Sequence, residues 1–416
     1  MVKLHLACAA TVLSIATVST HGFDIGVTSS PAQDSALDAK AKSIVDNFSL
    51  EQVAGQMTQI EIEAVLNDDY SLNETWPPLN NQYGWNASEF RAIVQRIQEI
   101  TMEENGGHPM IYGLDSVHGA NYVDGAVMFP QQINSAASFD PDMVYKVGQI
   151  TARDTQAAGI PWIFGPILEV SQNKLWARTF ETFGEDPYLV SVMGDAIVRG
   201  LQSLNQTAAC IKHFIGYSKT PTGHDRDNVI MADFDLLNYF MPQFKAAMKA
   251  GALTMMENYI SLNGNPVIAN RRILKDLLRS DLGFSGMLVS DWGEIYNLVD
   301  WHRIVDNYED AVALSLKETS IDMSMVPYDE MFINYTLNMV QRRPEYEARI
   351  RESAMRIVKT KLKLGLYDKP IPGKEYISMV GNNESVSVAL DVARESIVLL
   401  KNAHNTIYLT SAEKIC

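Results

Sequence analysis

The chain has 416 residues, with 34 Lys and Arg against 50 Asp and Glu, so its formal net charge is −16 at pH 7. This acidic balance excludes nucleic acid as a natural partner, because binding to phosphates requires a basic surface. Hydrophobic residues make up 46% of the chain, which is enough for a sizeable core and excludes general disorder.

Residues 1–22 have the features of a secretory signal peptide. Lys3 precedes an apolar run over residues 6–18, and the small residues Ser19 and Thr20 follow it. The run is too short to span a bilayer, which takes about 20 apolar residues. No later segment reaches about 18 consecutive apolar residues. We therefore predict a secreted, extracellular protein without a membrane partner, with a lysosomal or cell-wall location as further possibilities.

Glycosylation signals and cysteines agree with this prediction. Asn-x-Ser/Thr sequons, each of them a weak signal alone, occur at Asn47, Asn73, Asn86, Asn205, Asn334 and Asn383. Only Cys210 and Cys416 follow the leader, and Cys210 lies in an apolar run typical of a buried thiol. This is no disulfide framework, and no metal-ligand spacing is present. We predict neither a metal nor a cofactor.

Short apolar runs recur along the middle of the chain. Near-continuous runs of this kind are typical of parallel strands that are covered on both faces. The predicted strands are Met110–Asp115, Trp162–Ile167, Ala208–Phe214, Ala252–Tyr259, Met287–Asp291 and Ile321–Met325.

Helical patterns with start signals lie between these runs. Asp140-Pro141 and Asp186-Pro187 each place an N-cap and a first-turn proline before an amphipathic segment. Asn270 is the predicted cap of a third helix that Gly283 ends. The strands start roughly 30–50 residues apart, as in βα units. No G-x-G-x-x-G follows any strand, so a doubly wound dinucleotide fold is disfavoured. We predict an α/β fold, a closed (β/α)₈ TIM-type barrel over residues 23–365.

Polar residues stand at the ends of several predicted strands. Asp115 ends one run, Lys212 and His213 lie near the end of another, and Asp291 ends a third. The carboxyl ends of barrel strands face the active site. A single Asp there is about as often a helix cap, but several such residues on different strands favour a site. Composition and periodicity predict no reaction beyond this.

At these positions the sequence resembles glycoside hydrolase family 3, which contains β-glucosidases and exo-β-glucanases. The resemblance runs in order from about Leu50 to Asn402. The matching motifs are Ser49-Leu-Glu-Gln-Val-Ala-Gly-Gln-Met-Thr-Gln, Tyr112-Gly-Leu-Asp-Ser-Val-His-Gly, Phe129-Pro-Gln, Glu181-Thr-Phe-Gly-Glu-Asp-Pro, Lys212-His-Phe with Gly223-His-Asp-Arg, Gly283-Phe-Ser-Gly-Met-Leu-Val-Ser-Asp-Trp, and Ser396-Ile-Val-Leu-Leu-Lys-Asn.

The resemblance implies roles for individual residues. Asp291, in the Ser-Asp-Trp motif, would be the nucleophile of a retaining glycosidase, whose second carboxyl protonates the leaving oxygen. The implied residues that bind the terminal sugar or line its pocket are Asp115, Arg178, Lys212, His213, Met256, Tyr259 and Trp292. Arg178 could instead pair with Glu181 or Glu185, and Met256 is as typical of core as of a pocket. Glu185 and Asp186 are interpreted as a helix start.

One departure affects specificity. The family's usual R-D-P-R-W-G-R is here Gln172-Asn-Lys-Leu-Trp-Ala-Arg. Polar contacts before Trp176 therefore differ, and the resemblance leaves the sugar and linkage preference open.

The resemblance also implies a second domain. Residues 366–382 would be a linker, and residues 383–416 would be the first helix and strand, Asn383 onward and Ile397–Leu400, of a truncated α/β sandwich. In two-domain members the general acid/base is a glutamate deep in that domain. It would therefore be absent from this chain.

The expected function is a secreted retaining β-glucosidase that acts on terminal β-D-glucosyl residues of β-glucosides and β-glucan oligosaccharides, impaired by the missing acid. A non-catalytic sugar-binding or decoy protein is the alternative. A β-N-acetylglucosaminidase would carry Asp-x-His after Lys-His, whereas His224-Asp225 stand in the opposite order; it and a β-xylosidase are further alternatives. The sequence predicts no oligomeric state.

Overall fold

The computed structural model describes residues 31–62, 84–326 and 329–403. The predicted signal peptide and the Asn73 sequon lie outside these residues. Within the described ranges, no helix has the length and apolar character needed to cross a membrane.

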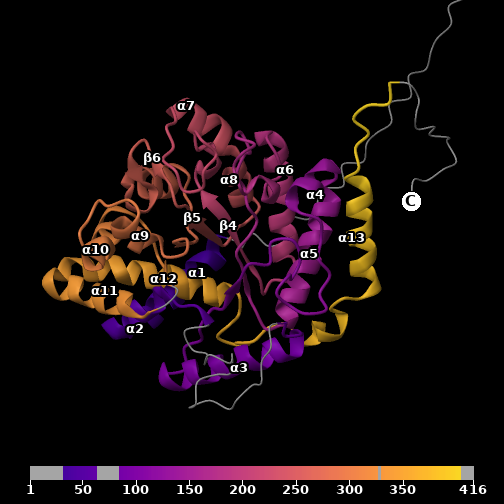
Figure 1. Ribbon diagram of the computed structural model, residues 1–416. Coiled ribbons are helices and arrows are strands. Elements are labelled where there is room, and N and C mark those ends of the chain that lie inside the picture. Colours follow the sequence, from indigo (N-terminus) through magenta and orange to yellow (C-terminus); the bar gives the residue numbers. More distant parts are fainter. Residues whose placement is uncertain (1–30, 63–83, 327–328, 404–416) are drawn as a thin grey trace, which may run out of the picture.

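A curled parallel sheet forms the centre of the molecule (Figure 1). Its five hydrogen-bonded strands, in spatial order, are β2 (Gly113–Leu114), β3 (Trp162–Ile163), β4 (Ala208–Phe214), β5 (Thr254–Glu257) and β8 (Met287–Val289). β9 (Ser324–Met325) pairs in parallel with β1 (Thr58–Gln59), and a single bridge from Val289 to Met323 connects this pair to β8. A small antiparallel hairpin joins β6 (Ser261–Leu262) to β7 (Asn265–Pro266).

The sheet is a half-barrel rather than a closed barrel. Among the described residues, β1 pairs only with β9, and β2 pairs only with β3. The prediction of a complete (β/α)₈ barrel is therefore wrong, although the six predicted strands and their parallel order are confirmed. Apolar runs reveal that strands exist, but closure depends on pairing between β1 and β2, which local patterns do not specify.

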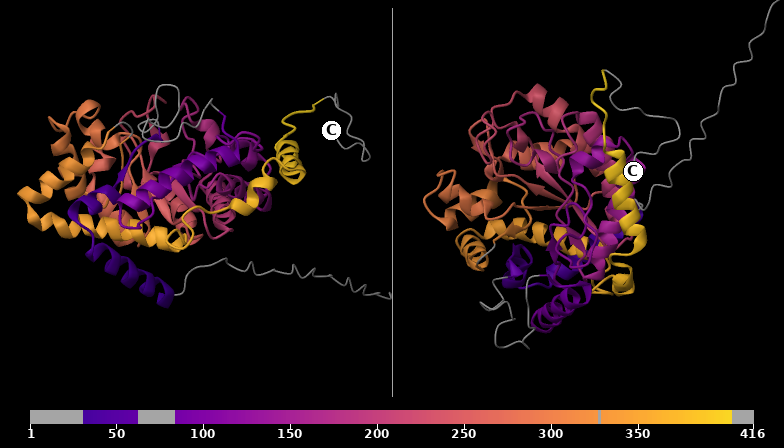
Figure 2. Two further views of the ribbon diagram at one scale, coloured as in Figure 1. Left: turned by 90° about the horizontal axis from the view of Figure 1, so that it is seen from below. Right: turned by 45° about the vertical axis from the view of Figure 1, so that its right-hand side comes forward.

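Helices surround the sheet (Figure 2). They are α1 (Pro31–Asp46), α2 (Leu50–Gln56), α3 (Ala87–Glu104), α4 (Gln132–Ala137), α5 (Pro141–Ala157), α6 (Pro187–Gln202), α7 (Asp233–Asp235), α8 (Pro242–Lys249), α9 (Glu294–Asp300), α10 (Tyr308–Glu318), α11 (Met331–Arg342), α12 (Glu347–Lys363) and α13 (Asn383–Glu395).

Two of the three predicted helix starts are confirmed. The Asp140 side chain accepts from the backbone of Asp142 and Met143 at the start of α5, and Asp186 accepts from the Tyr188 backbone at the start of α6. The third helix is a π-helix, η6 (Arg272–Asp281), and no side chain caps its start. The predicted side-chain cap at Asn270 is therefore wrong.

The described segment after α12 contains two helices. A short 3-10 helix, η8 (Lys374–Met379), lies within the predicted linker. α13 lies against α5 (Figures 1 and 2), where Arg153 Nη2 donates to Ser385 Oγ at 2.7 Å. Among the described residues, Ile397–Leu400 form no strand, in contrast to the prediction, and Leu400 is 91% exposed. An isolated strand cannot satisfy its backbone or bury its apolar side chains.

Candidate active site

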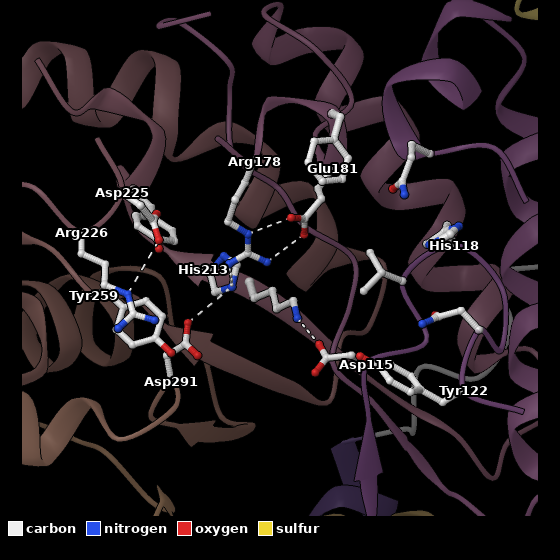
Figure 3. A pocket seen from close by; sticks show the side chains of 16 residues that line it. Asp115, His118, Tyr122, Arg178, Glu181, His213, Asp225, Arg226, Tyr259 and Asp291 are labelled. Carbon is white, nitrogen blue, oxygen red and sulfur yellow. Dashed lines mark hydrogen bonds and ion pairs between the residues drawn. The ribbon is translucent and has the colours of Figure 1, made fainter. Parts of the chain in front are cut away.

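A cavity of about 370 Å³ opens at the carboxyl ends of the sheet strands (Figure 3). Its lining combines charged, polar and aromatic side chains from several strands and loops. They are Asp115, Val117, His118, Asn121, Tyr122, Gln131, Arg178, Phe180, Glu181, Lys212, His213, Tyr217, Asp225, Arg226, Tyr259 and Asp291.

Asp291 follows β8 and presents one unpaired carboxylate oxygen. Its Oδ1 accepts from the Trp292 backbone N–H at 2.7 Å, and its own backbone N–H donates to Glu257 Oε1 at 3.0 Å. Oδ2 is buried without a hydrogen-bond partner, 3.5 Å from His213 Nε2. The carboxylate is thus held through Oδ1, while Oδ2 is buried beside His213 at the wall of the cavity.

Lys212 and Asp115 form an ion pair between two strands. Lys212 lies on β4 and is 3% exposed, and its Nζ is 2.5 Å from Oδ1 of Asp115, which follows β2. Because Lys212 is buried, this charge-assisted hydrogen bond holds both side chains in fixed positions. The other carboxylate oxygen of Asp115, Oδ2, takes no part in the hydrogen bond with Lys212.

Arg178 precedes a 3-10 turn, η2 (Thr179–Glu181), and binds two cavity residues. Its Nε and Nη2 donate to the two carboxylate oxygens of Glu181 at 2.9 and 2.8 Å, and Nη1 lies 3.2 Å from His213 Nε2. Burial lowers the pKa of Arg178, but the hydrogen bonds and charge of Glu181 outweigh this and raise it. The pairing with Glu181 considered from the sequence is present, and Arg178 also lines the cavity.

Glu169 is a site residue that the sequence interpretation missed. It is 1% exposed, and its Oε1 accepts from both the backbone N–H of His213, at 2.8 Å, and the ring Nδ1, at 2.7 Å. Because Arg178 donates to Nε2, the proton of a neutral His213 ring lies on Nδ1. Burial raises the pKa of Glu169 to about 7, and burial together with the Arg178 charge lowers that of His213 well below its usual value.

A second buried glutamate supports Asp291 from behind. Glu257 ends β5, is 0% exposed, and accepts the Asp291 backbone N–H. Burial and the nearby charge of Glu294 raise the pKa of Glu257 well above its usual value. Glu294 in turn lies 2.7 Å from His302 Nε2. The signal for Glu169 and Glu257 was visible: each is a lone carboxylate in an otherwise apolar strand region.

The remaining predicted pocket residues, Tyr259, Met256 and Trp292, differ in whether they line the cavity. Tyr259 lines the cavity, and burial and the Asp291 charge raise its pKa. The Arg226 guanidinium lies 3.8 Å from the Tyr259 ring centroid. Met256 and Trp292 are not among the lining residues. Met256 packs into the core, as both faces of β5 are covered, and Trp292 is 37% exposed outside the cavity.

The five sequons within the described ranges are all at exposed asparagines, as a glycan requires. These are Asn47, Asn86, Asn205, Asn334 and Asn383. The Asn86 side chain also caps α3. Glycosylation at these positions stays a prediction.

Residues 50–360 match the N-terminal domain of glycosyl hydrolase family 3. The chain belongs to this family. It is 36% identical over 412 residues to the lysosomal β-glucosidase of Dictyostelium discoideum, covering 91% of this chain and 50% of the relative. It is 33% identical over 337 residues to a β-xylosidase of Formosa agariphila, covering 76% and 46%.

A solved structure has the same fold. The β-glucosidase of Erythrobacter marinus superposes with a TM-score of 0.80 at 26% identity, covering 92% of this chain and 51% of that one. The chain thus spans about half the length of the relatives it matches. The resemblance predicted from the sequence motifs is confirmed.

Proposed function

We propose that this chain carries the nucleophile and the terminal-sugar site of a secreted retaining β-glucosidase. The observation that supports this most directly is the Asp291 carboxylate. Oδ1 is fixed by a backbone N–H, and Oδ2 has no partner within a cavity lined by charged donors and acceptors. A retaining glycosidase needs such a positioned, unpaired oxygen to attack the anomeric carbon.

The surrounding pairs would hold the sugar for this attack. The Lys212–Asp115 pair and the Arg178–His213 contact offer donors and acceptors to sugar hydroxyls at fixed positions. Binding the ring through its hydroxyls orients C1 toward Asp291 Oδ2 and supplies part of the barrier reduction by positioning alone. Attack forms a bond from Oδ2 to C1 while the bond from C1 to the aglycone oxygen breaks. Water then hydrolyses the glycosyl ester.

The general acid/base belongs to another part of the protein in this proposal. Of the described carboxyls that line the cavity besides Asp291, Asp115 is paired with Lys212, Glu181 with Arg178, and Asp225 lies 3.7 Å from Arg226 Nε. Each is engaged by a cation. We therefore place the acid outside the described residues, in agreement with the family resemblance.

The test compares glucosides whose leaving groups differ in how much protonation they need, with a protein of residues 23–416 as the enzyme. General acid catalysis contributes about 10²–10⁴-fold, so the chain should hydrolyse cellobiose poorly. A dinitrophenyl β-glucoside needs little protonation and should glycosylate Asp291, and azide should speed turnover by attacking the glycosyl-enzyme. Efficient cellobiose hydrolysis would contradict the placement of the acid, and the loop Ser218–Asp227 would be the first alternative source.

Two controls separate the competing functions. A dinitrophenyl β-xyloside measures whether xylose is preferred, as the Formosa agariphila relative's name suggests for that protein. Glucose binding without any turnover of the activated glucoside would instead support a non-catalytic sugar-binding role. Comparison of the secreted and intracellular fractions tests secretion.

A further inference from the structure

A second cleft lies on the helices that follow β8. Figure 1 shows α9, α10 and α11 together at one side of the sheet, and α10 packs against both of the others. The cleft has a volume of about 460 Å³ and is lined by Val299, Asp306, Asn307, Tyr308, Glu309 and Tyr335. None of these residues lines the active-site cavity. The volume lies within the range of small-molecule sites, about 300–1,000 Å³, so the cleft can hold a ligand of its own.

Three tyrosines build the aromatic wall of this cleft, which we call the tyrosine cleft. The rings of Tyr296 and Tyr308 are stacked, with centroids 4.6 Å apart and planes inclined by 29°, and Tyr335 packs edge-on against Tyr296. Tyr296 is not a lining residue, so it supports Tyr308 from behind. Tyr308 is 37% exposed. Because Tyr296 covers one face of its ring, the other face is left for the cleft.

Hydrogen bonds of the stacked tyrosines hold this wall in place. The Tyr308 hydroxyl lies 3.2 Å from both carboxylate oxygens of Asp300, and the Tyr296 hydroxyl donates to Asp329 Oδ1 at 3.3 Å. Burial and the Asp329 charge raise the pKa of Tyr296, so its hydroxyl stays protonated as a donor. A ring that is already fixed loses little conformational freedom when a ligand binds to it.

The polar residues of the tyrosine cleft favour a neutral ligand that carries hydroxyl groups. Arg342 Nη1 is bound to Glu309 Oε1, and the cleft is otherwise acidic, which disfavours an anion. A cation is held best by several ring faces around it, whereas the stacked pair presents one face. Asp306 makes no hydrogen bond or ion pair with another described residue, so its carboxylate can accept from ligand hydroxyls. A flat ring bordered by such acceptors suits a sugar, which has apolar faces and polar edges.

One short segment connects the tyrosine cleft to the rim of the active-site cavity. Asp300, which ends α9, binds the Tyr308 hydroxyl. The next residue, Trp301, donates from Nε1 to the backbone carbonyl of Arg226 at 3.2 Å, and Arg226 lines the active-site cavity. Trp301 is 57% exposed. A long ligand bound at the tyrosine cleft is therefore held on the side of the molecule where the Arg226 loop borders the active site.

We propose that the tyrosine cleft is a second carbohydrate-binding site, which binds a neutral β-linked polysaccharide chain outside the active site. This inference goes beyond the proposed function, because it concerns no residue of the active-site cavity. A polymer held at a second site raises the effective concentration of its own chain ends near the first site. The cleft would thus select polymeric over short sugars without taking part in the reaction.

The experiment measures polymer binding by residues 23–416 in native gels that contain a soluble β-1,3/1,4-glucan or a β-1,4-xylan. The protein is deglycosylated first, because the Asn334 sequon directly precedes Tyr335. We expect at least one polymer to retard the parent chain. Tyr308→Ala and Tyr335→Ala should each raise the dissociation constant about tenfold by removing a ring face. Tyr308→Phe keeps the ring and should stay within about threefold of the parent chain.

Two controls separate this site from the active site. Tyr188→Ala removes an exposed tyrosine outside both cavities and should leave polymer binding unchanged. Asp115→Ala should keep polymer binding while it loses glucose affinity by calorimetry, and the two tyrosine-to-alanine variants should show the opposite. Loss of glucose binding by the parent chain would count against the proposed function alone.

Three results would overturn the inference and leave the proposed function standing. The first is a parent chain that neither polymer retards. The second is polymer binding that is lost in Asp115→Ala but kept in both Tyr308→Ala and Tyr335→Ala, which would place the polymer in the active-site cavity. The third is binding of benzyltrimethylammonium at the tyrosine cleft without binding of either polymer, which would identify a site for organic cations.

Discussion

Replacing Glu169 tests whether a fully buried carboxylate sets the orientation of His213. Glu169→Gln keeps an acceptor oxygen of the same reach, so both His213 donors can stay paired, and we expect glucose affinity within about tenfold of the unchanged chain. Glu169→Ala removes the acceptor of two buried donors, the backbone N–H and Nδ1. Each unpaired buried donor costs about 1–3 kcal/mol, so the two together amount to about 2–6 kcal/mol.

Part of that energy should appear in the free energy of unfolding and part in sugar binding. Without the Nδ1 bond, the imidazole no longer has a fixed tautomer or ring plane, and its Nε2 loses its alignment toward Arg178 and Asp291. We expect the Ala variant to bind glucose at least about tenfold more weakly by calorimetry, measured on the folded protein. A merely structural role would lower stability but leave the affinity of folded Glu169→Ala unchanged, and that result would refute the reasoning.

Three other variants test the nucleophile, the sugar-binding pair and the sheet. Asp291→Asn should form no adduct with a fluorinated dinitrophenyl glucoside; normal labelling would show that another residue reacts. Asp115→Ala should weaken glucose binding by at least about tenfold, because a charge-assisted bond contributes about 1.5–3 kcal/mol, and unchanged calorimetric affinity would exclude this role. Asp322 is 0% exposed, and, although burial raises its pKa, Arg356 and Arg279 lower it below its usual value. Its stabilising contribution is present above the unfolded-state pKa and is lost as pH falls through the folded one. Asp322→Asn should therefore lower the free energy of unfolding by about 3–5 kcal/mol, measured with urea at pH 7. The variant should also lose less stability than the parent chain as the pH is lowered. Equal stability of the two chains would contradict this.

The sequence predicted the parts of the fold that local patterns determine. Strands such as Ala208–Phe214 are continuous apolar runs because both faces are covered, and the starts at Asp140 and Asp186 are capping motifs with a proline. Closure of the sheet was mispredicted because it depends on pairing between distant strands. The apolar run at 397–400 resembles a strand, but a strand also needs a partner to pair with.

The candidate site was predictable where polar residues end strands and match family motifs, as Asp115, Lys212 and Asp291 do. The residues that orient them, Glu169 and Glu257, were missed because they belong to none of the matching motifs and because their partners, His213 and Asp291, are far away in the chain.

The charge pattern of the cavity explains why Asp291 stands apart from its neighbours. A sugar is neutral and cannot neutralise the groups that bind it, so charged binding residues are stable only if they neutralise one another. Lys212 is paired with Asp115 and Arg178 with Glu181, and the lowered pKa of His213 keeps its ring neutral. The carboxylate of Asp291 is left with a single fixed oxygen and an unpaired one. In the proposed reaction, positive charge develops at C1 as the glycosidic bond breaks. An unpaired anion next to balanced ion pairs interacts most strongly with that transition state and weakly with the neutral sugar, which is the condition for accelerating the chemical step.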